Sequence, residues 1–249
     1  MIRTLARTSI LTLFFACSPA RGTSIVVLAN RTQIAVAADS AETDSKGKNN
    51  RQACKIFRLR NFFFVVSGTF RKDEIDSLAV AAQGTDDLVE IQKRFNELVK
   101  KPLEAVVENR LAHVPSYAME LRGNTQVLQV IIFRLDPTGP VLAESMFPFK
   151  LLKSGKVRIE DAQTRICKNG EGECSLIIGE AEEAKQYVSK HPLGQDLIAD
   201  AEQLVRIEAE AHPGTVGGNI SMLLLDAGGT HPINMSPGCP WRITVRVSR

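Results

Sequence analysis

The sequence of 249 residues predicts an α+β fold in which β-sheets are stacked between layers of helices. Short runs of β-branched and small apolar residues open the part of the chain after the first 22 residues, and similar runs return near its end. Between these runs lie segments whose apolar residues recur at helical spacing. The resulting order is strands, helices, strands, helices, strands. This order indicates sheets that are covered by helices.

The first strands are expected at 24–28 and 33–38. Both runs lack a clean alternation of apolar and polar residues, which favours burial on both faces of the sheet. A polar loop is expected at 42–52. A hairpin of two strands, 56–59 and 62–67, should follow, and the second strand is rich in Phe and Val. We expect that strand to belong to the core.

The middle of the chain is expected to be helical, beginning with 73–82. A second helix is predicted to start at Thr85, a natural cap, with two Asp residues in the first turn. Pro102 should kink or split this helix before 103–112 continues it. Further strands are expected at 126–134, 141–149, 156–160, 175–178, 220–225 and 242–247, and further helices at 181–189 and 196–210.

Three polar residues stand at the ends of the first strands: Thr23, Asp39 and Lys55. A Thr hydroxyl becomes a nucleophile when a base takes its proton, and a free α-amino group on the same residue can be that base. A nearby ammonium lowers the pKa of the amine by like-charge repulsion. Lys55 can supply this charge, and Asp39 can hold Lys55 in place. An ion pair without a catalytic role is the alternative for these two residues.

These residues and their flanking strands resemble the opening of the proteasome β-subunit family, within the N-terminal nucleophile (Ntn) hydrolases. The resemblance rests on Gly22-Thr23-Ser24-Ile25-Val26-Val27, Ala37-Ala38-Asp39-Ser40 and Lys55-Ile56-Phe57. It implies a four-layer αββα sandwich, with Thr23, Asp39 and Lys55 as the catalytic residues. It also implies that the backbone of Thr43 lines the substrate cleft and that the Gly68 N–H, with Thr69 as a second candidate, forms the oxyanion hole. The scheme needs no metal or cofactor.

The sequence departs from the family pattern at the residues that support the terminal amine. Pro213 and Val216 stand where active subunits carry an Asp and a Ser before the late Gly-Gly. Glu180 stands where the family has a Ser between two glycines. Ring assembly is common in the family, but these residues do not establish a homo-oligomer.

Residues 1–22 resemble an export signal, with two Arg residues before a short apolar run. That run is too short to span a membrane. Cleavage after Gly22 would make Thr23 the first residue of a periplasmic or secreted protein, and cleavage after Ala20 is a competing site. In a lipoprotein alternative, Cys17 is lipidated and Thr23 lies inside the chain.

The apparent basicity of the chain belongs to the expected signal. The chain has 31 Lys and Arg against 28 Asp and Glu, and three of the Arg residues lie in residues 1–22. The remaining 227 residues balance at 28 against 28, which gives no support for nucleic-acid binding. They contain no repeat or linker, so 23–249 is expected to be one domain.

Four cysteines remain after the signal: Cys54, Cys167, Cys174 and Cys239. An even number in an exported protein favours disulfides. Cys167 and Cys174 flank a polar hairpin tip and are expected to pair, which leaves Cys54 to pair with Cys239. A free Cys54, buried in the core, is the alternative.

The sequence thus predicts hydrolysis of a peptide or another amide by Thr23. Peptidase is the default by resemblance, and the residues do not fix the substrate. A catalytically silent, secreted scaffold that binds a partner is the second hypothesis, and the replacements at Pro213 and Val216 favour it.

Overall fold

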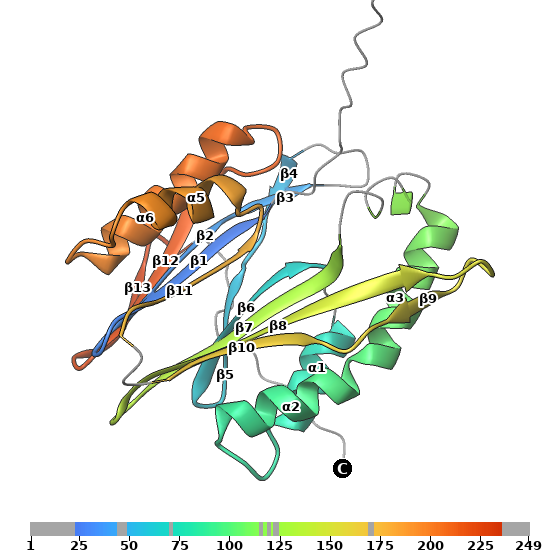
Figure 1. The fold of residues 1–249 in the computed structure, drawn as a ribbon, viewed down its shortest axis with the longest axis horizontal. Coiled ribbons are helices and arrows are strands. Elements are labelled where there is room, and N and C mark those ends of the chain that lie inside the picture. The colour runs from blue at the N-terminus through green and yellow to red at the C-terminus, as the bar shows by residue number, and fades with distance from the viewer. Residues whose placement is uncertain are drawn as a thin grey trace, which may run out of the picture.

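The computed structural model of the chain contains two antiparallel sheets and, among the residues described, five helices (Figure 1). The structure describes residues 23–43, 49–69, 72–114, 117–118, 121, 125–168 and 172–235. The expected strand at 242–247 lies outside these residues. The α+β class predicted from the sequence is confirmed.

The first sheet has five strands in the order β11-β1-β2-β12-β13, and neighbouring strands are antiparallel. Its strands are β1 (Ser24–Ala29), β2 (Ile34–Asp39), β11 (Cys174–Gly179), β12 (Ile220–Asp226) and β13 (Gly229–Ile233). Every residue of β1 and β2 is buried, as the lack of alternation predicted. The candidate residues Thr23 and Asp39 therefore lie at one end of two central, rigid strands.

The second sheet follows the order β10-β8-β7-β6-β5, and the short strand β9 pairs with β8. Its strands are β5 (Ile56–Leu59), β6 (Phe62–Gly68), β7 (Gln126–Asp136), β8 (Gly139–Leu151), β9 (Val157–Ile159) and β10 (Gln163–Lys168). Two short strands, β3 (Ala41–Thr43) and β4 (Asn49–Gln52), pair with each other where the sequence predicts a polar loop. Loop composition does not exclude pairing, because each strand supplies backbone partners to the other.

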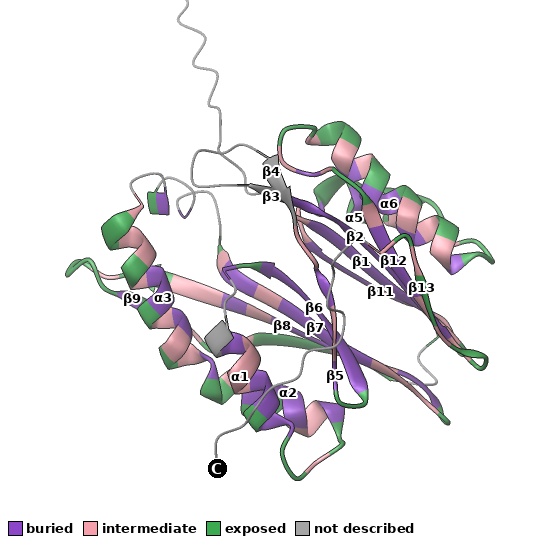
Figure 2. Cartoon of the chain, turned by 180° about the vertical axis from the view of Figure 1, so that it is seen from behind, coloured by how far each residue is buried: buried purple, intermediate pink, exposed green. Residues whose placement is uncertain are grey.

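Helices cover the outer face of each sheet (Figures 1 and 2). The helices α5 (Glu182–Lys190) and α6 (Leu197–Ala211) pack on the first sheet. The helices α1 (Lys72–Ala81), α2 (Leu88–Leu98) and α3 (Lys100–His113) pack on the second sheet. The helical segment is split into α2 and α3 at Val99, close to Pro102, as predicted.

Three apolar clusters hold these layers together. One contains Val26, Ala37 and Leu204, and lies between the first sheet and its helices. A second contains Ile25, Val36 and Phe133, and lies between the two sheets. The third contains Phe64, Ile132 and Phe95, and lies between the second sheet and α1–α3. Successive residues of β1 therefore point into different clusters, since strand side chains alternate between the two faces.

Some local predictions were wrong. The N-cap of α2 is Asp87, whose side chain accepts the Val89 N–H, and Thr85 instead accepts the Asp87 N–H. The strands β10 and β13 were not predicted. Charged or polar residues and a Pro interrupt their apolar pattern, and both strands form because a neighbouring strand offers hydrogen bonds.

The predicted Cys167–Cys174 disulfide is present and links β10 to β11. Cys54 is also disulfide-bonded, so the free-thiol alternative is wrong. Its expected partner, Cys239, lies outside the described residues. No helix in the described part of the chain is long and apolar enough to cross a membrane.

Candidate active site

Asp39 and Lys55 form a buried ion pair at the end of β2. Lys55 Nζ lies 2.7 Å from Asp39 Oδ1, and it also donates to the carbonyl of Ala41 at 2.9 Å. Asp39 is 1% exposed and Lys55 8% exposed. Charged side chains are seldom buried to this extent unless they are paired, so the position of each depends on the other.

The backbone around Asp39 holds the carboxylate from three further directions. Asp39 Oδ1 accepts the N–H of Ser24 at 2.9 Å. Oδ2 accepts the N–H groups of Ala41 at 3.2 Å and Gly217 at 3.3 Å. Burial raises the pKa of Asp39, while Lys55 and the donated hydrogen bonds oppose that increase. One carboxylate thus ties Lys55 to the residue that follows Thr23.

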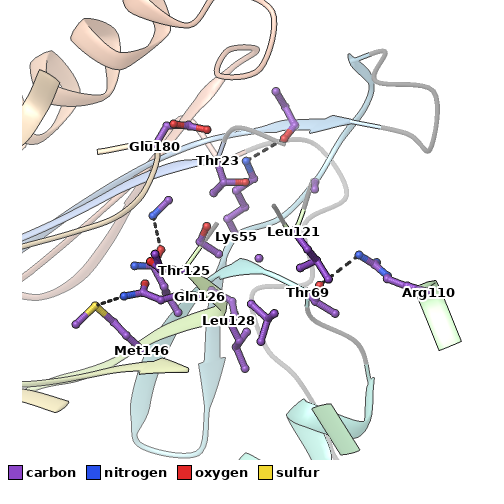
Figure 3. Close-up of a pocket in the computed structure, with 18 of the residues that line it drawn as sticks. Thr23, Lys55, Thr69, Arg110, Leu121, Thr125, Gln126, Leu128, Met146 and Glu180 are labelled. Carbon is purple, nitrogen blue, oxygen red and sulfur yellow. Dashed lines mark hydrogen bonds between the residues drawn. The ribbon is translucent and has the colours of Figure 1, made fainter. Parts of the chain in front are cut away.

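Thr23 and Lys55 line one cavity of about 590 Å³ that opens between the two sheets (Figure 3). Thr23 is half-buried and lies just before β1, and Lys55 lies just before β5. Gly68, at the end of β6, lines the same cavity. The structure therefore brings together residues that are 32 and 13 positions apart in the chain.

The strand pairing of β6 determines where the Gly68 N–H points. Gly68 lies opposite Leu128 of β7, and the next residue, Thr69, donates its N–H to Val127 O at 2.8 Å. In an antiparallel ladder successive N–H groups alternate between the two sides of the strand. The Gly68 N–H therefore points away from β7, toward the side where β5 begins only at Ile56.

The backbone at Gly68 leaves no room for a side chain. Its φ is +98°, and a Cβ there would lie 2.4 Å from the carbonyl oxygen of Val127. The Thr69 N–H is bound to that same carbonyl, so Thr69 is not a second oxyanion donor as the sequence had suggested. Of the two predicted donors, only the Gly68 N–H points away from β7.

Of the other residues singled out in the sequence, Val216 and Pro213 do not line the cavity. Val216 is 1% exposed, and it contributes an apolar side chain before the Gly217 N–H that binds Asp39. Pro213 lies in the turn that follows α6. Thr43 ends β3, and its side chain is outside the described part of the structure. The backbone N–H of Gly217 therefore supports Asp39, although neither Pro213 nor Val216 supplies a polar side chain.

Two further groups of residues line the cavity. Thr69 Oγ1 lies 2.7 Å from the Tyr117 hydroxyl, and the Arg110 guanidinium lies over the Tyr117 ring at 5.4 Å. At the other end, Glu180 lies beside Thr23 (Figure 3), and Lys185 lines the same cavity. The family resemblance had singled out Glu180 and the backbone of Thr69. Arg110, Tyr117 and Lys185 were not expected, because they come from segments far from the strand motifs and no sequence spacing connects them.

A scan of the chain against protein-family models finds no match, and a search of curated proteins finds none either.

Proposed function

We propose that the protein is an N-terminal threonine amide hydrolase, a peptidase by its resemblance to proteasome β-subunits, with Thr23 as the nucleophile. The observation that carries this proposal is the buried Asp39–Lys55 pair, whose ammonium shares a cavity with Thr23 and Gly68. An isolated structural ion pair needs no cavity beside it. This pair lies beside a cavity that Thr23 also lines, and Thr23 would carry both a hydroxyl and a free α-amine once residues 1–22 are removed.

The arrangement of layers also supports the proposal. Helices, two sheets and helices follow one another, and the candidate residues lie at one end of the space between the sheets. The four-layer αββα sandwich of Ntn hydrolases has this order. Fold alone does not define an activity, so the assignment depends on the chemistry of the site.

In the proposed reaction, the α-amine of Thr23 takes the proton of its own hydroxyl while Oγ forms a bond to the substrate carbonyl carbon. The carbon–nitrogen bond of the amide then breaks, and the ammonium gives its proton to the leaving nitrogen. Water attacks the resulting ester, with the amine again accepting a proton. The carbon–Oγ bond then breaks, and Oγ regains the proton.

Lys55 and Gly68 have separate roles in this scheme. The Lys55 ammonium lowers the pKa of the Thr23 amine, and a decrease of about one unit corresponds to about 1.4 kcal/mol. The Gly68 N–H stabilises the negative oxygen of the tetrahedral intermediate. Loss of one such donor typically costs about 2.7–4 kcal/mol of transition-state stabilisation.

The second candidate function is a silent, secreted scaffold that binds a partner. It is favoured by Pro213 and by the apolar Val216, because neither side chain can orient an amine by accepting a hydrogen bond. Lipidation at Cys17 is a third proposal and would leave Thr23 without its amine. Both alternatives predict a protein that no electrophile labels at Thr23.

The test is N-terminal sequencing of the exported protein, followed by covalent trapping with an electrophilic peptide inhibitor. We expect the sequence to begin at Thr23, and the inhibitor to modify that residue. Thr23→Ala should abolish both trapping and hydrolysis while the fold survives, and Thr23→Ser should retain trapping. The exposed Thr164 provides a matched control, since Thr164→Ala should behave as wild type. Full activity of Thr23→Ala, or a start at Cys17 or Arg21, would overturn the proposal.

A further inference from the structure

Glu180 is the acidic residue placed beside Thr23 by the pairing of β1 with β11. Ser24 lies opposite Gly179, and the Glu180 N–H donates to the carbonyl of Thr23 at 2.7 Å. Glu180 is half-buried and lines the same cavity as Thr23. Figure 3 shows the two residues at one end of this cavity, with Arg110 at the other.

The close approach of these two segments depends on Gly179. Its φ is +85°, and a Cβ there would lie 1.7 Å from the carbonyl oxygen of Thr23. The Gly179 N–H donates to Gln129 Oε1 at 2.8 Å, which ties this turn to β7 in the other sheet. The backbone of Glu180 is therefore held against Thr23 by contacts from both sheets.

Two other buried carboxylates, in the first sheet and its helices, accept backbone hydrogen bonds. Asp39 binds Lys55 and three backbone N–H groups, and Glu208 accepts the Ala184 N–H at 2.7 Å. Within the described residues, no hydrogen bond or ion pair is found for the Glu180 carboxylate. Among the described residues, the charged side chains that line the cavity are those of Lys55, Arg110, Glu180 and Lys185.

We propose that Glu180 is a positioning residue for the amine of Thr23, an inference that rests on the proposed function. When residues 1–22 are removed, the carboxylate accepts a hydrogen bond from the new α-amine and orients it toward Oγ. It takes over the support that the side chains of Pro213 and Val216 cannot give.

The charge of Glu180 acts on the amine in the direction opposite to that of Lys55. A carboxylate nearby favours the protonated amine and raises its pKa, whereas the Lys55 ammonium lowers it. In this proposal the amine lies between the Lys55 ammonium and the Glu180 carboxylate, and Lys185 lines the same cavity. During attack by Oγ, the amine becomes an ammonium, and the Glu180 carboxylate stabilises that charge.

The experiment measures the pKa of the Thr23 amine directly in the processed protein. Thr23 is carbamylated with cyanate over a range of pH, and mass spectrometry follows the rate. Divided by the concentration of isocyanic acid at each pH, this rate reports the unprotonated fraction of the amine. We expect Glu180→Gln to lower the pKa of the Thr23 amine by about 0.5 to 1, the effect of one charge at this range in a partly solvated site. Trapping by the inhibitor should slow at least tenfold, and its acidic limb should move to lower pH. Glu180→Asp should restore part of the wild-type rate.

Glu183→Gln is the matched control. Glu180 and Glu183 both raise the pKa of Glu208 by their charge, after the larger effect of burial, but Glu183 is exposed on α5 and does not line the cavity. This variant should leave both the pKa of the Thr23 amine and the trapping rate unchanged. If the pKa of the Thr23 amine is unchanged in Glu180→Gln, or if it changes equally in Glu183→Gln, the proposed role of Glu180 is overturned.

The two proposals fail in different ways. A wild-type protein that begins at Thr23 but is not trapped contradicts the hydrolase. A decrease in the amine pKa of Glu180→Gln would still support the contact in that case. A protein that begins at another residue overturns both proposals.

Discussion

Asp39 shows how one side chain can organise a site, since its carboxylate accepts hydrogen bonds from β1, β3, Lys55 and the loop before β12. Asp39→Asn keeps the shape but leaves the Lys55 ammonium buried without a counter-charge. We expect the free energy of unfolding to decrease by about 3 kcal/mol, as measured in urea.

An exposed ion pair on α2 provides the control for this prediction. Arg94 Nε lies 2.8 Å from Glu90 Oε1, and both side chains are more than 40% exposed. Glu90→Gln should change the free energy of unfolding by no more than about 0.5 kcal/mol, because solvent screens the pair. Equal effects of Asp39→Asn and Glu90→Gln would show that the buried pair does not hold the end of β2 in place.

At the scale of elements, a disulfide links β10 to β11 at the end of β11 that is far from the site. Cys167 and Cys174 are 7 residues apart, and Cys174 lies opposite Ala29 while Gly179, near Thr23, lies five positions along β11. Closing so short a loop contributes about 2.5 kcal/mol in the chain-entropy model. We expect the free energy of unfolding of Cys167→Ala/Cys174→Ala, measured in urea, to be lower than that of wild type by about this amount.

The same variant separates stability from chemistry. Five positions along a strand correspond to about 17 Å, so the disulfide does not contact Thr23. The rate of covalent trapping at low temperature should therefore equal that of wild type. A large decrease in trapping by folded protein would show that the two ends of β11 are coupled.

At the scale of the whole molecule, burial of carboxyl groups in separate layers determines part of the pH dependence of stability. Burial raises the pKa of Glu144, which is on β8, and of Glu208, which lies beneath α5. A raised pKa means that the folded state binds protons more tightly than the unfolded state. The contribution of each group to stability is therefore greatest below its ordinary pKa of 4.5 and is lost as pH rises through the folded value.

Glu208→Gln tests this sign. The amide oxygen can still accept the Ala184 N–H, but no buried charge forms at neutral pH. We expect the variant to be more stable than wild type near pH 7, with a difference that shrinks as pH falls toward 4.5. Thermal unfolding across this pH range measures it. A difference that grows on acidification would contradict the assignment.

Much of the fold could be predicted because local patterns and final packing agree. The buried runs of β1, β2 and β6 are apolar on both faces, and the amphipathic patterns of α2 and α6 match their buried stripes. Predicted and observed bounds of α5 and α6 differ by one residue at each end. The strands β10 and β13 could not be predicted, since they depend on a neighbouring strand more than on their own residues.

For the site, the sequence alone determined the residue types and their places at strand ends: a Thr before β1, an Asp that ends β2 and a Lys before β5. The tertiary structure alone decided the distance of 2.7 Å between Lys55 and Asp39, the donation of the Thr69 N–H to Val127 O, and the hydrogen bond from the Glu180 N–H to the carbonyl of Thr23. The physical reason is range. Strand propensity acts over a few neighbouring residues, whereas these contacts depend on the register between strands and on the packing of two sheets, which no local spacing encodes.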